Sequence, residues 1–166
     1  GQLKEIISPD LVQKRVSEIG QEISVKFKGK VPIIIGVLNG AFLFMADLVR
    51  NLSIQFEVDF IKIDSYGENT MSSGTVRLIK DISADITGRD VIVVEDIVDT
   101  GLSLKFLKNR MNEASPKSLS IATCLYKPDV ASQELSIDWV GFKIDDDYVV
   151  GYGLDLKQIY RGLPGI

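Results

Sequence analysis

The sequence contains no histidine, and its 166 residues include a single cysteine, Cys124. Without histidine, any general acid or base must be an aspartate, a glutamate, a lysine or a tyrosine. One cysteine cannot form an intrachain disulfide, which is typical of proteins from a reducing compartment. Since no signal peptide is apparent either, we expect a cytoplasmic protein.

A long hydrophobic run and a surplus of basic residues are also absent. The most apolar region, residues 31–46, is interrupted by Pro32, Gly36, Asn39 and Gly40 and is too short for a membrane helix. A formal net charge of -4 argues against a general nucleic-acid binder, which needs a basic face for phosphate contacts. The length, with 45% hydrophobic and 25% charged residues, predicts a single globular domain rather than a disordered chain.

Two common nucleotide-binding motifs are missing. A Walker-type NTPase needs G-x-x-x-x-G-K-[ST], but Gly29-Lys30 is followed by Val31. A dinucleotide fold needs G-x-G-x-x-G after its first strand, whereas Gly151-Tyr152-Gly153 lacks the third glycine and comes late in the sequence. The sequence therefore argues against both classes.

Apolar segments that alternate with helical patterns predict an α/β fold with a mostly parallel central sheet flanked by helices. The clearest strand is Val91-Ile92-Val93-Val94, because consecutive β-branched residues are typical of a strand buried on both faces. Ser8-Pro9-Asp10 predicts the start of the first helix, whose apolar stripe comprises Leu11, Val12, Val16, Ile19 and Ile23. Further strands are expected over residues 31–38, 56–63, 76–79, 118–126 and 149–153, with helices after residues 41 and 101.

The stretch from Val91 to Ser103 carries the most information about function. Its acids, Glu95 and Asp96, follow the buried strand and so lie at the carboxyl end, where open α/β sheets bind ligands. Asp99-Thr100-Gly101 is typical of a turn and precedes a helical pattern. The backbone amides of residues 99–103 would therefore face outward at a helix N-terminus. Such amides form an anion site.

The acids themselves suggest a ligand. Glu95 and Asp96 could each accept a hydrogen bond from one hydroxyl of a ribose cis-diol, which leaves Asp99 to act as a base. A sugar held by its diol on one side and by its 5′-phosphate on the other is a phosphoribosyl group. The alternative is an ordinary buried strand that ends in solvated acids, although three acids and a glycine turn within a few residues favour the site.

Four other segments could reach the same edge of the sheet, each with a simpler alternative. Leu38-Asn39-Gly40 could offer amides to a pyrophosphate or be a plain strand-to-helix turn. The polar residues 64–74 could form a lid, with Tyr66 over a substrate, or a tolerated surface loop. Lys127 could face the acids or solvate a turn, and Asp145-Asp146-Asp147 could bind Mg²⁺ or be a solvated turn.

Residues 91–103 resemble the PRPP signature of the type I phosphoribosyltransferases, in which an apolar strand, two acids and two apolar residues precede Asp-Thr-Gly. Nearly the whole chain resembles the hypoxanthine-guanine phosphoribosyltransferases, and its length resembles their compact bacterial form. The other matching motifs are Gly36-Val37-Leu38-Asn39-Gly40, Ser65-Tyr66-Gly67, Tyr126-Lys127-Pro128-Asp129, Trp139-Val140-Gly141-Phe142, Val149-Val150-Gly151-Tyr152 and Tyr160-Arg161-Gly162-Leu163-Pro164.

The resemblance implies one type I phosphoribosyltransferase domain over residues 1–166, with a small hood formed by roughly residues 1–10 and 128–166. It implies purine salvage, in which the phosphoribosyl group of PRPP passes to a 6-oxopurine base, hypoxanthine or guanine, to give IMP or GMP and pyrophosphate. Mg²⁺ is the implied cofactor, and a homodimer or homotetramer the implied assembly. The alternative function is an RNA-binding regulatory protein built on the same fold, which would need a basic dimer face; the acidic balance favours the enzyme.

The resemblance also implies roles for individual residues. Glu95 and Asp96 would hold the ribose hydroxyls, and Asp99 would be the base near purine N7. The 5′-phosphate would lie against Ile97, Asp99, Thr100, Gly101, Leu102 and Ser103, and the pyrophosphate against Leu38, Asn39, Gly40 and Arg161. The purine would meet Lys127 at its 6-oxo group, the stacked ring of Trp139 and the backbone of Val140.

Mg²⁺ would be bound by Asp146 together with Glu95 and Asp96, and Ser65 and Tyr66 would belong to a mobile loop. One departure from the family concerns charge, because Asn39 stands where lysine is common. That change removes a cation from the predicted pyrophosphate site.

Overall fold

The computed structural model describes residues 2–66, 75–131 and 135–166. A six-stranded sheet with the order β3-β2-β1-β4-β5-β6 forms its centre. Strand β3 runs antiparallel to β2, and every other neighbouring pair is parallel, which confirms the predicted α/β class. The strands are β1 (Ile33–Leu38), β2 (Glu57–Tyr66), β3 (Thr75–Lys80), β4 (Asp90–Val98), β5 (Ser118–Tyr126) and β6 (Trp139–Lys143).

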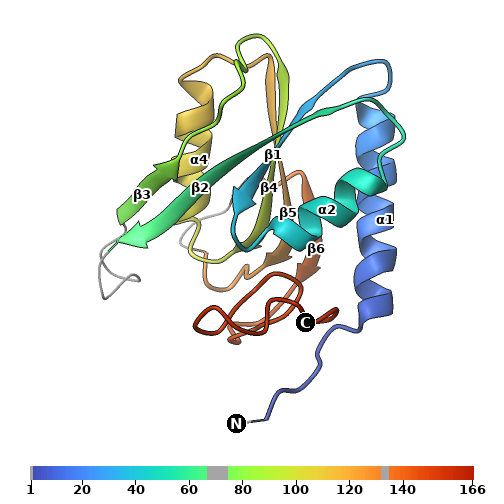
Figure 1. Ribbon diagram of the computed structural model, residues 1–166, viewed down its shortest axis with the longest axis vertical. Coiled ribbons are helices and arrows are strands. Elements are labelled where there is room, and N and C mark those ends of the chain that lie inside the picture. Colours follow the sequence, from blue (N-terminus) through green and yellow to red (C-terminus); the bar gives the residue numbers. More distant parts are fainter. Residues whose placement is uncertain (1, 67–74, 132–134) are drawn as a thin grey trace.

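Helices cover both faces of the sheet. Figure 1 shows α1 (Pro9–Lys26) and α2 (Phe42–Arg50) on one face and α4 (Leu102–Asn112) on the other. Helix α1 begins as predicted, because the Ser8 side chain accepts a hydrogen bond from the Leu11 amide and proline occupies the first turn. The stripe prediction was wrong for Leu11, which is 53% exposed. Val12, Val16, Ile19 and Ile23 form the buried face of the helix, and Leu11 lies about 100° around the helix axis from Val12.

Strand β4 is buried on both faces, as four consecutive β-branched residues predicted. Ile92 and Val94 pack into the core beneath α1 and α2, whereas Val91 and Val93 pack into the core beneath α4. The α4 side chains in that second core are Leu104, Leu107 and Met111, all of them buried. Packing on both faces fixes where β4 ends and therefore where its acids emerge.

The predicted strand over residues 149–153 does not form. Tyr152 has φ 48° and Gly153 has φ 98°, and positive φ values are incompatible with an extended strand. Gly151 makes only an isolated bridge with Leu154, and the Tyr152 amide donates to the Leu163 carbonyl. This C-terminal segment instead turns back on itself beyond the carboxyl ends of the central strands, where it is drawn in red in Figure 1.

Two other predictions concern the ends of the sheet and the chain. Residues 67–74 of the predicted lid lie outside the described residues, although β3 confirms the returning strand. Near the N-terminus, Ile6 and Ile7 donate to the Ile166 carbonyl at 2.8 and 2.9 Å. That pairing agrees with a hood built from both ends of the chain, but its boundaries stay a prediction. No helix in the described ranges has the length and apolarity needed to cross a bilayer.

Candidate active site

The carboxyl ends of β1 and β4 form the switch point of the sheet. The chain leaves β1 towards β2 on one side and leaves β4 towards β5 on the other, so the two loops diverge and leave a crevice. A pocket of about 380 Å³ occupies it. Its lining comes from β1 and its loop (Val37, Leu38, Asn39, Gly40), β2 (Ile63, Asp64, Ser65), β4 with the loop into α4 (Glu95, Asp96, Ile97, Val98, Asp99, Thr100, Gly101, Ser103, Leu104) and the C-terminal segment (Asp155, Arg161).

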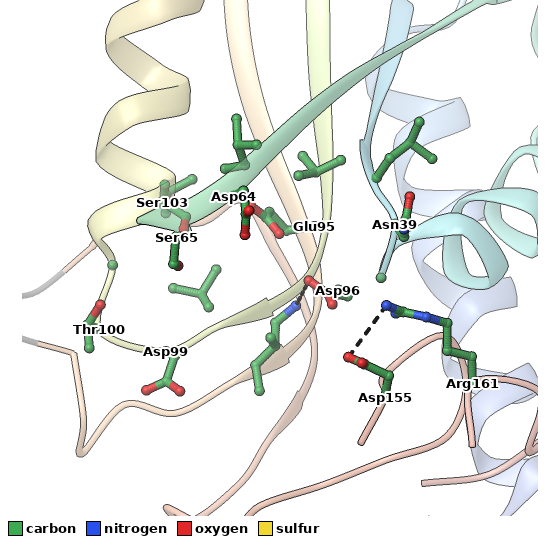
Figure 2. Close-up of a pocket in the computed structure, with 18 residues that line it drawn as sticks. Asn39, Asp64, Ser65, Glu95, Asp96, Asp99, Thr100, Ser103, Asp155 and Arg161 are labelled. Carbon is green, nitrogen blue, oxygen red and sulfur yellow. Dashed lines mark hydrogen bonds and ion pairs between the residues drawn. The ribbon is translucent and has the colours of Figure 1, made fainter. Parts of the chain in front are cut away.

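Glu95 and Asp96 lie in the middle of this pocket. Figure 2 shows them between the loop of Asp99 to Ser103 on one side and Asn39 with Arg161 on the other. Glu95 is only 3% exposed, and burial, together with the adjacent charge of Asp96, raises its pKa well above the ordinary range. Burial also raises the pKa of Asp96, although hydrogen bonds and the charge of Arg161 oppose the shift. Hydrogen bonds from ligand hydroxyls, or a bound cation, would stabilise the ionised form of this carboxyl pair.

The loop after β1 reaches this acid pair because Gly40 has no side chain. A Cβ at that position would overlap the carboxylate of Asp96. Asn39 is exposed to the pocket next to it, and the peptide bond between Leu38 and Asn39 is cis. The predicted pyrophosphate loop and the predicted ribose acids are therefore in direct contact.

The loop after β4 leads into the N-terminus of α4. Gly101 is the N-cap residue of α4, with φ 97° in the left-handed region, which favours glycine. The Leu102 amide donates to Thr100 Oγ1 at 3.4 Å, and Thr100 and Ser103 line the pocket. Leu102 itself is not among the lining residues. The outward amides of this helix start suit a phosphate.

Lys127 lies beside the pocket, at the end of β5. Its Nζ is 3.6 Å from Asp99 Oδ2 and 3.3 Å from Asp146 Oδ1. The residue is only 7% exposed, and its amide donates to the Val98 carbonyl at 3.0 Å. The structure thus brings the predicted 6-oxo partner next to the predicted base.

Arg161 supplies a cation on the opposite wall. Its Nη1 donates to the Gly153 carbonyl at 2.6 Å, its Nη2 donates to Gln158 Oε1 at 3.0 Å, and its guanidinium pairs with Asp155 Oδ1 at 3.5 Å. Figure 2 shows this ion pair facing Asp96. Asp155 was missed by sequence reasoning, because a single aspartate in an irregular segment has no spacing that marks it.

Three predicted site residues are placed elsewhere. Asp146 is not a lining residue, and its carboxylate lies against Lys127 instead. Trp139 is 8% exposed and packs in the core beneath α1, with its ring 6.5 Å from that of Phe27. The carbonyl of Val140 accepts a hydrogen bond from Arg15 Nη2 at 2.9 Å. None of the three is therefore a lining residue of this pocket, and the assignments of Asp146 to Mg²⁺ and of Trp139 and Val140 to the purine stay predictions.

The two residues assigned to the mobile loop lie at the end of β2. Ser65 lines the pocket, and Tyr66 pairs in register with Thr75 of β3. The rest of the loop, residues 67–74, is outside the described ranges.

The pocket is acidic. Five of the side chains that line it are carboxylates, at positions 64, 95, 96, 99 and 155, whereas Arg161 is the one cationic side chain among the described lining residues. A ligand that carries several phosphates would need additional positive charge to bind here.

Comparison with known proteins decides the family. A family profile described as a phosphoribosyl transferase domain matches residues 4–158. The hypoxanthine-guanine phosphoribosyltransferase of Bacillus subtilis is 43% identical over 163 residues, which cover 98% of this chain and 91% of that protein. The chain belongs to the hypoxanthine-guanine phosphoribosyltransferase family.

Other members of the family agree in sequence and in structure. The hypoxanthine phosphoribosyltransferase of Buchnera aphidicola is 44% identical over 166 residues, with coverage of 99% of this chain and 94% of that protein. The crystal structure of a hypoxanthine-guanine phosphoribosyltransferase from Bacillus anthracis has a TM-score of 0.95 at 42% identity and covers 99% of this chain and 97% of that one. The predicted family and purine-salvage activity are thereby confirmed. None of these relatives is named as an RNA-binding regulator, so the alternative gains no support.

Proposed function

We propose that the pocket between β1 and β4 binds PRPP and that the phosphoribosyl group is transferred there to a 6-oxopurine, hypoxanthine or guanine. The observation that carries this proposal is the convergence of three features on one pocket. They are the acid pair Glu95–Asp96, the N-terminus of α4 and the loop after β1 with Arg161. Their arrangement matches the three parts of PRPP, which are its ribose diol, 5′-phosphate and pyrophosphate.

The ribose would be held between the two phosphate sites. Glu95 and Asp96 would accept hydrogen bonds from its 2′- and 3′-hydroxyls, which would favour the ionised form of the carboxyl pair. The 5′-phosphate would accept from the amides at the start of α4 and from the hydroxyls of Thr100 and Ser103. Pyrophosphate would then extend towards Arg161, whose guanidinium suits phosphate oxygens.

Mg²⁺ would bind to carboxylates of the pocket together with oxygens of the substrate. No group of three or more His, Cys, Asp or Glu side chains within residues 2–66, 75–131 and 135–166 could hold a metal ion alone. Mg²⁺ in phosphate sites commonly uses one or two carboxylates together with substrate oxygens, and Asp155 with the Glu95–Asp96 pair offers them. When bound, the ion draws negative charge onto the leaving pyrophosphate.

The purine would enter on the side of Lys127. The lysine ammonium would donate to the 6-oxo oxygen, and Asp99 would accept the proton from N7 as N9 attacks the sugar. For stacking we propose Tyr148 as a second candidate beside the predicted Trp139, because Tyr148 is 73% exposed. Its hydroxyl donates to the carbonyl of Asp155 at 2.8 Å, and Asp155 lines the pocket.

Substitution at the anomeric carbon passes through an oxocarbenium-like state, as in glycoside hydrolysis. The residues of this chain would stabilise charge at both ends of that state. Glu95 and Asp96 lie next to the ribose, where positive charge develops, and Arg161 lies next to the pyrophosphate, where negative charge accumulates. A protein that holds both ends accelerates departure of the pyrophosphate.

Assays of hypoxanthine, guanine, xanthine and adenine with PRPP and Mg²⁺ test the proposal. We expect nucleotide and pyrophosphate to form with hypoxanthine and guanine and not with adenine, and chelation of Mg²⁺ to abolish turnover. Adenine used as readily as hypoxanthine, or turnover without PRPP, would contradict it. The cytoplasmic location and the homodimer or homotetramer stay predictions, and the mass measured in solution tests the latter.

A further inference from the structure

A buried tyrosine links the C-terminal segment to the helix that follows the pyrophosphate loop. Tyr152 is 4% exposed, and its hydroxyl donates to Asp47 Oδ2 of α2 at 2.5 Å. Gln13 of α1 donates its Nε2 to the same oxygen at 3.1 Å. One carboxylate oxygen thereby joins three parts of the chain that are distant in sequence.

The residue after this tyrosine contacts two parts of the pocket. A Cβ at Gly153 would overlap the carbonyl oxygen of Gly40, so the segment lies directly on the loop after β1. The Gly153 carbonyl accepts from Arg161 Nη1 at 2.6 Å, and its amide donates to the Arg161 carbonyl at 2.8 Å. The position of Gly153 therefore sets both the backbone and the guanidinium of Arg161.

The tyrosine acts as a donor at every working pH. Burial, followed by the hydrogen bond to Asp47, raises the pKa of Tyr152 far above its ordinary range. A hydroxyl that donates to a carboxylate makes a stronger bond than a neutral pair. Within the described part of the chain, Tyr152 and Asp47 form no hydrogen bond with Glu95 or Asp96 at the centre of the pocket.

We propose that Tyr152 is a positioning residue for diphosphate binding. Its bond to Asp47 fixes Gly153 against Gly40, and Gly153 in turn holds Arg161 towards the pyrophosphate. This inference rests on the proposed function, because it assigns Arg161 to the pyrophosphate of PRPP. Loss of the bond should weaken the binding of diphosphate groups and leave the purine side, beyond Asp99, unaffected.

The test removes the single hydroxyl with Tyr152→Phe. We expect KM for PRPP in the forward reaction, and KM for pyrophosphate in the reverse reaction, to rise roughly three- to tenfold. This is less than the roughly 10- to 100-fold worth of a hydrogen bond to a charged group, because Tyr152 acts on the diphosphate only through Gly153 and Arg161. KM for hypoxanthine and the pH profile of kcat should stay at the wild-type values. Asp47→Asn retains an acceptor for the phenol and should show a smaller rise, whereas Asp47→Ala should match Tyr152→Phe.

A matched control lies at the amino ends of β4 and β5, away from the pocket. Ser118 Oγ donates to Asp90 Oδ1 at 2.6 Å, so Ser118→Ala also removes one hydroxyl-to-carboxylate bond. It should lower Tm to a similar extent and leave every KM unchanged. A Tyr152→Phe protein that behaves like this control, with a lower Tm and no change in KM, would show that Tyr152 is only structural and overturn the inference.

Calorimetric binding of pyrophosphate in the presence of Mg²⁺ separates this inference from the proposed function. If the wild type forms no nucleotide but Tyr152→Phe still binds pyrophosphate more weakly, the proposed function fails and the inference stands. If both proteins are active and bind pyrophosphate equally, the inference alone fails. Should Tyr152→Phe not fold, Asp47→Asn supports the same comparison, and unchanged binding in it would also count against the proposal.

Discussion

The reading of the purine by Lys127 can be tested with a change whose size follows from the structure. We consider Lys127→Met, which keeps most of the buried stem and removes the ammonium. The two carboxylates that the ammonium contacts have side chains 48% exposed for Asp99 and 70% exposed for Asp146, so water can solvate them when the cation is lost. The Lys127 side chain itself is only 8% exposed, and the cost of desolvating its ammonium offsets the attraction to the two carboxylates, so the free energy of unfolding should change little.

The effect on catalysis should be larger. A hydrogen bond to a charged group is worth roughly 1.5–3 kcal/mol, which corresponds to a loss of roughly 10- to 100-fold in kcat/KM for hypoxanthine. Adenine presents an amino donor at position 6, which an ammonium cannot accept from. The variant should therefore narrow the ratio of kcat/KM between hypoxanthine and adenine, because only the 6-oxopurine loses a partner.

The assay compares kcat/KM for both bases in the wild type, Lys127→Met and Lys14→Met. Lys14 is an exposed lysine of α1, so the control changes the net charge equally without altering the pocket. An undiminished preference for hypoxanthine in Lys127→Met would refute the reasoning. It would mean that Lys127 serves only as a partner for its two acids and that another group reads position 6.

Three further changes test other walls of the pocket. Asp99→Asn keeps the shape but removes the proton acceptor, so the forward rate should fall by roughly 10²-fold while PRPP binding measured by calorimetry persists. Asn39→Lys adds a cation at an exposed position of the pyrophosphate loop, and pyrophosphate inhibition should tighten by an amount that shrinks as salt rises; unchanged inhibition would show that this side chain points away. Asp155→Asn should raise the Mg²⁺ concentration needed for half-maximal activity, and Asp146→Asn, with the same change in charge, tests the predicted ligand Asp146 in the same assay; a larger rise in Asp146→Asn would assign the ion to Asp146 rather than Asp155.

The parts of the site that could be predicted from sequence are those encoded by neighbouring residues. A β-branched run, two acids and a glycine turn determine a buried strand, its polar end and a helix start within thirteen residues, and β4 with α4 has that form. The same holds for the Ser8 cap of α1. In each case the residues that reveal the element lie within a few positions along the chain.

The C-terminal segment could not be predicted in this way. Its path depends on contacts with distant residues, since Tyr152 bonds to Asp47 and Gly153 lies on Gly40. Apolar and glycine residues over 149–153 have the pattern of a strand, and only the positive φ values show that they form none. Asp155 could not be predicted either, because it lies in this irregular segment and no spacing marks it.

The motif at residues 139–142 shows that a sequence pattern does not say which face of the sheet a residue occupies. Trp139 starts β6 and packs into the core next to Phe27. Arg15 of α1 donates hydrogen bonds to the carbonyls of Val140 and Gly141. The motif therefore attaches the edge strand to α1, and its assignment to the purine stays a prediction.

Arg161 is the one cationic side chain among the described lining residues of a pocket rich in carboxylic acids. With asparagine at position 39, the loop after β1 offers only neutral donors to a pyrophosphate, and the ionised acids of the lining repel it. Positive charge must then come from Arg161 and from cations that accompany the ligand. An arginine on an irregular segment would lose much of its effect if it moved by about 1 Å, so its anchorage through Gly153 and Tyr152 determines how much diphosphate binding the chain itself can supply.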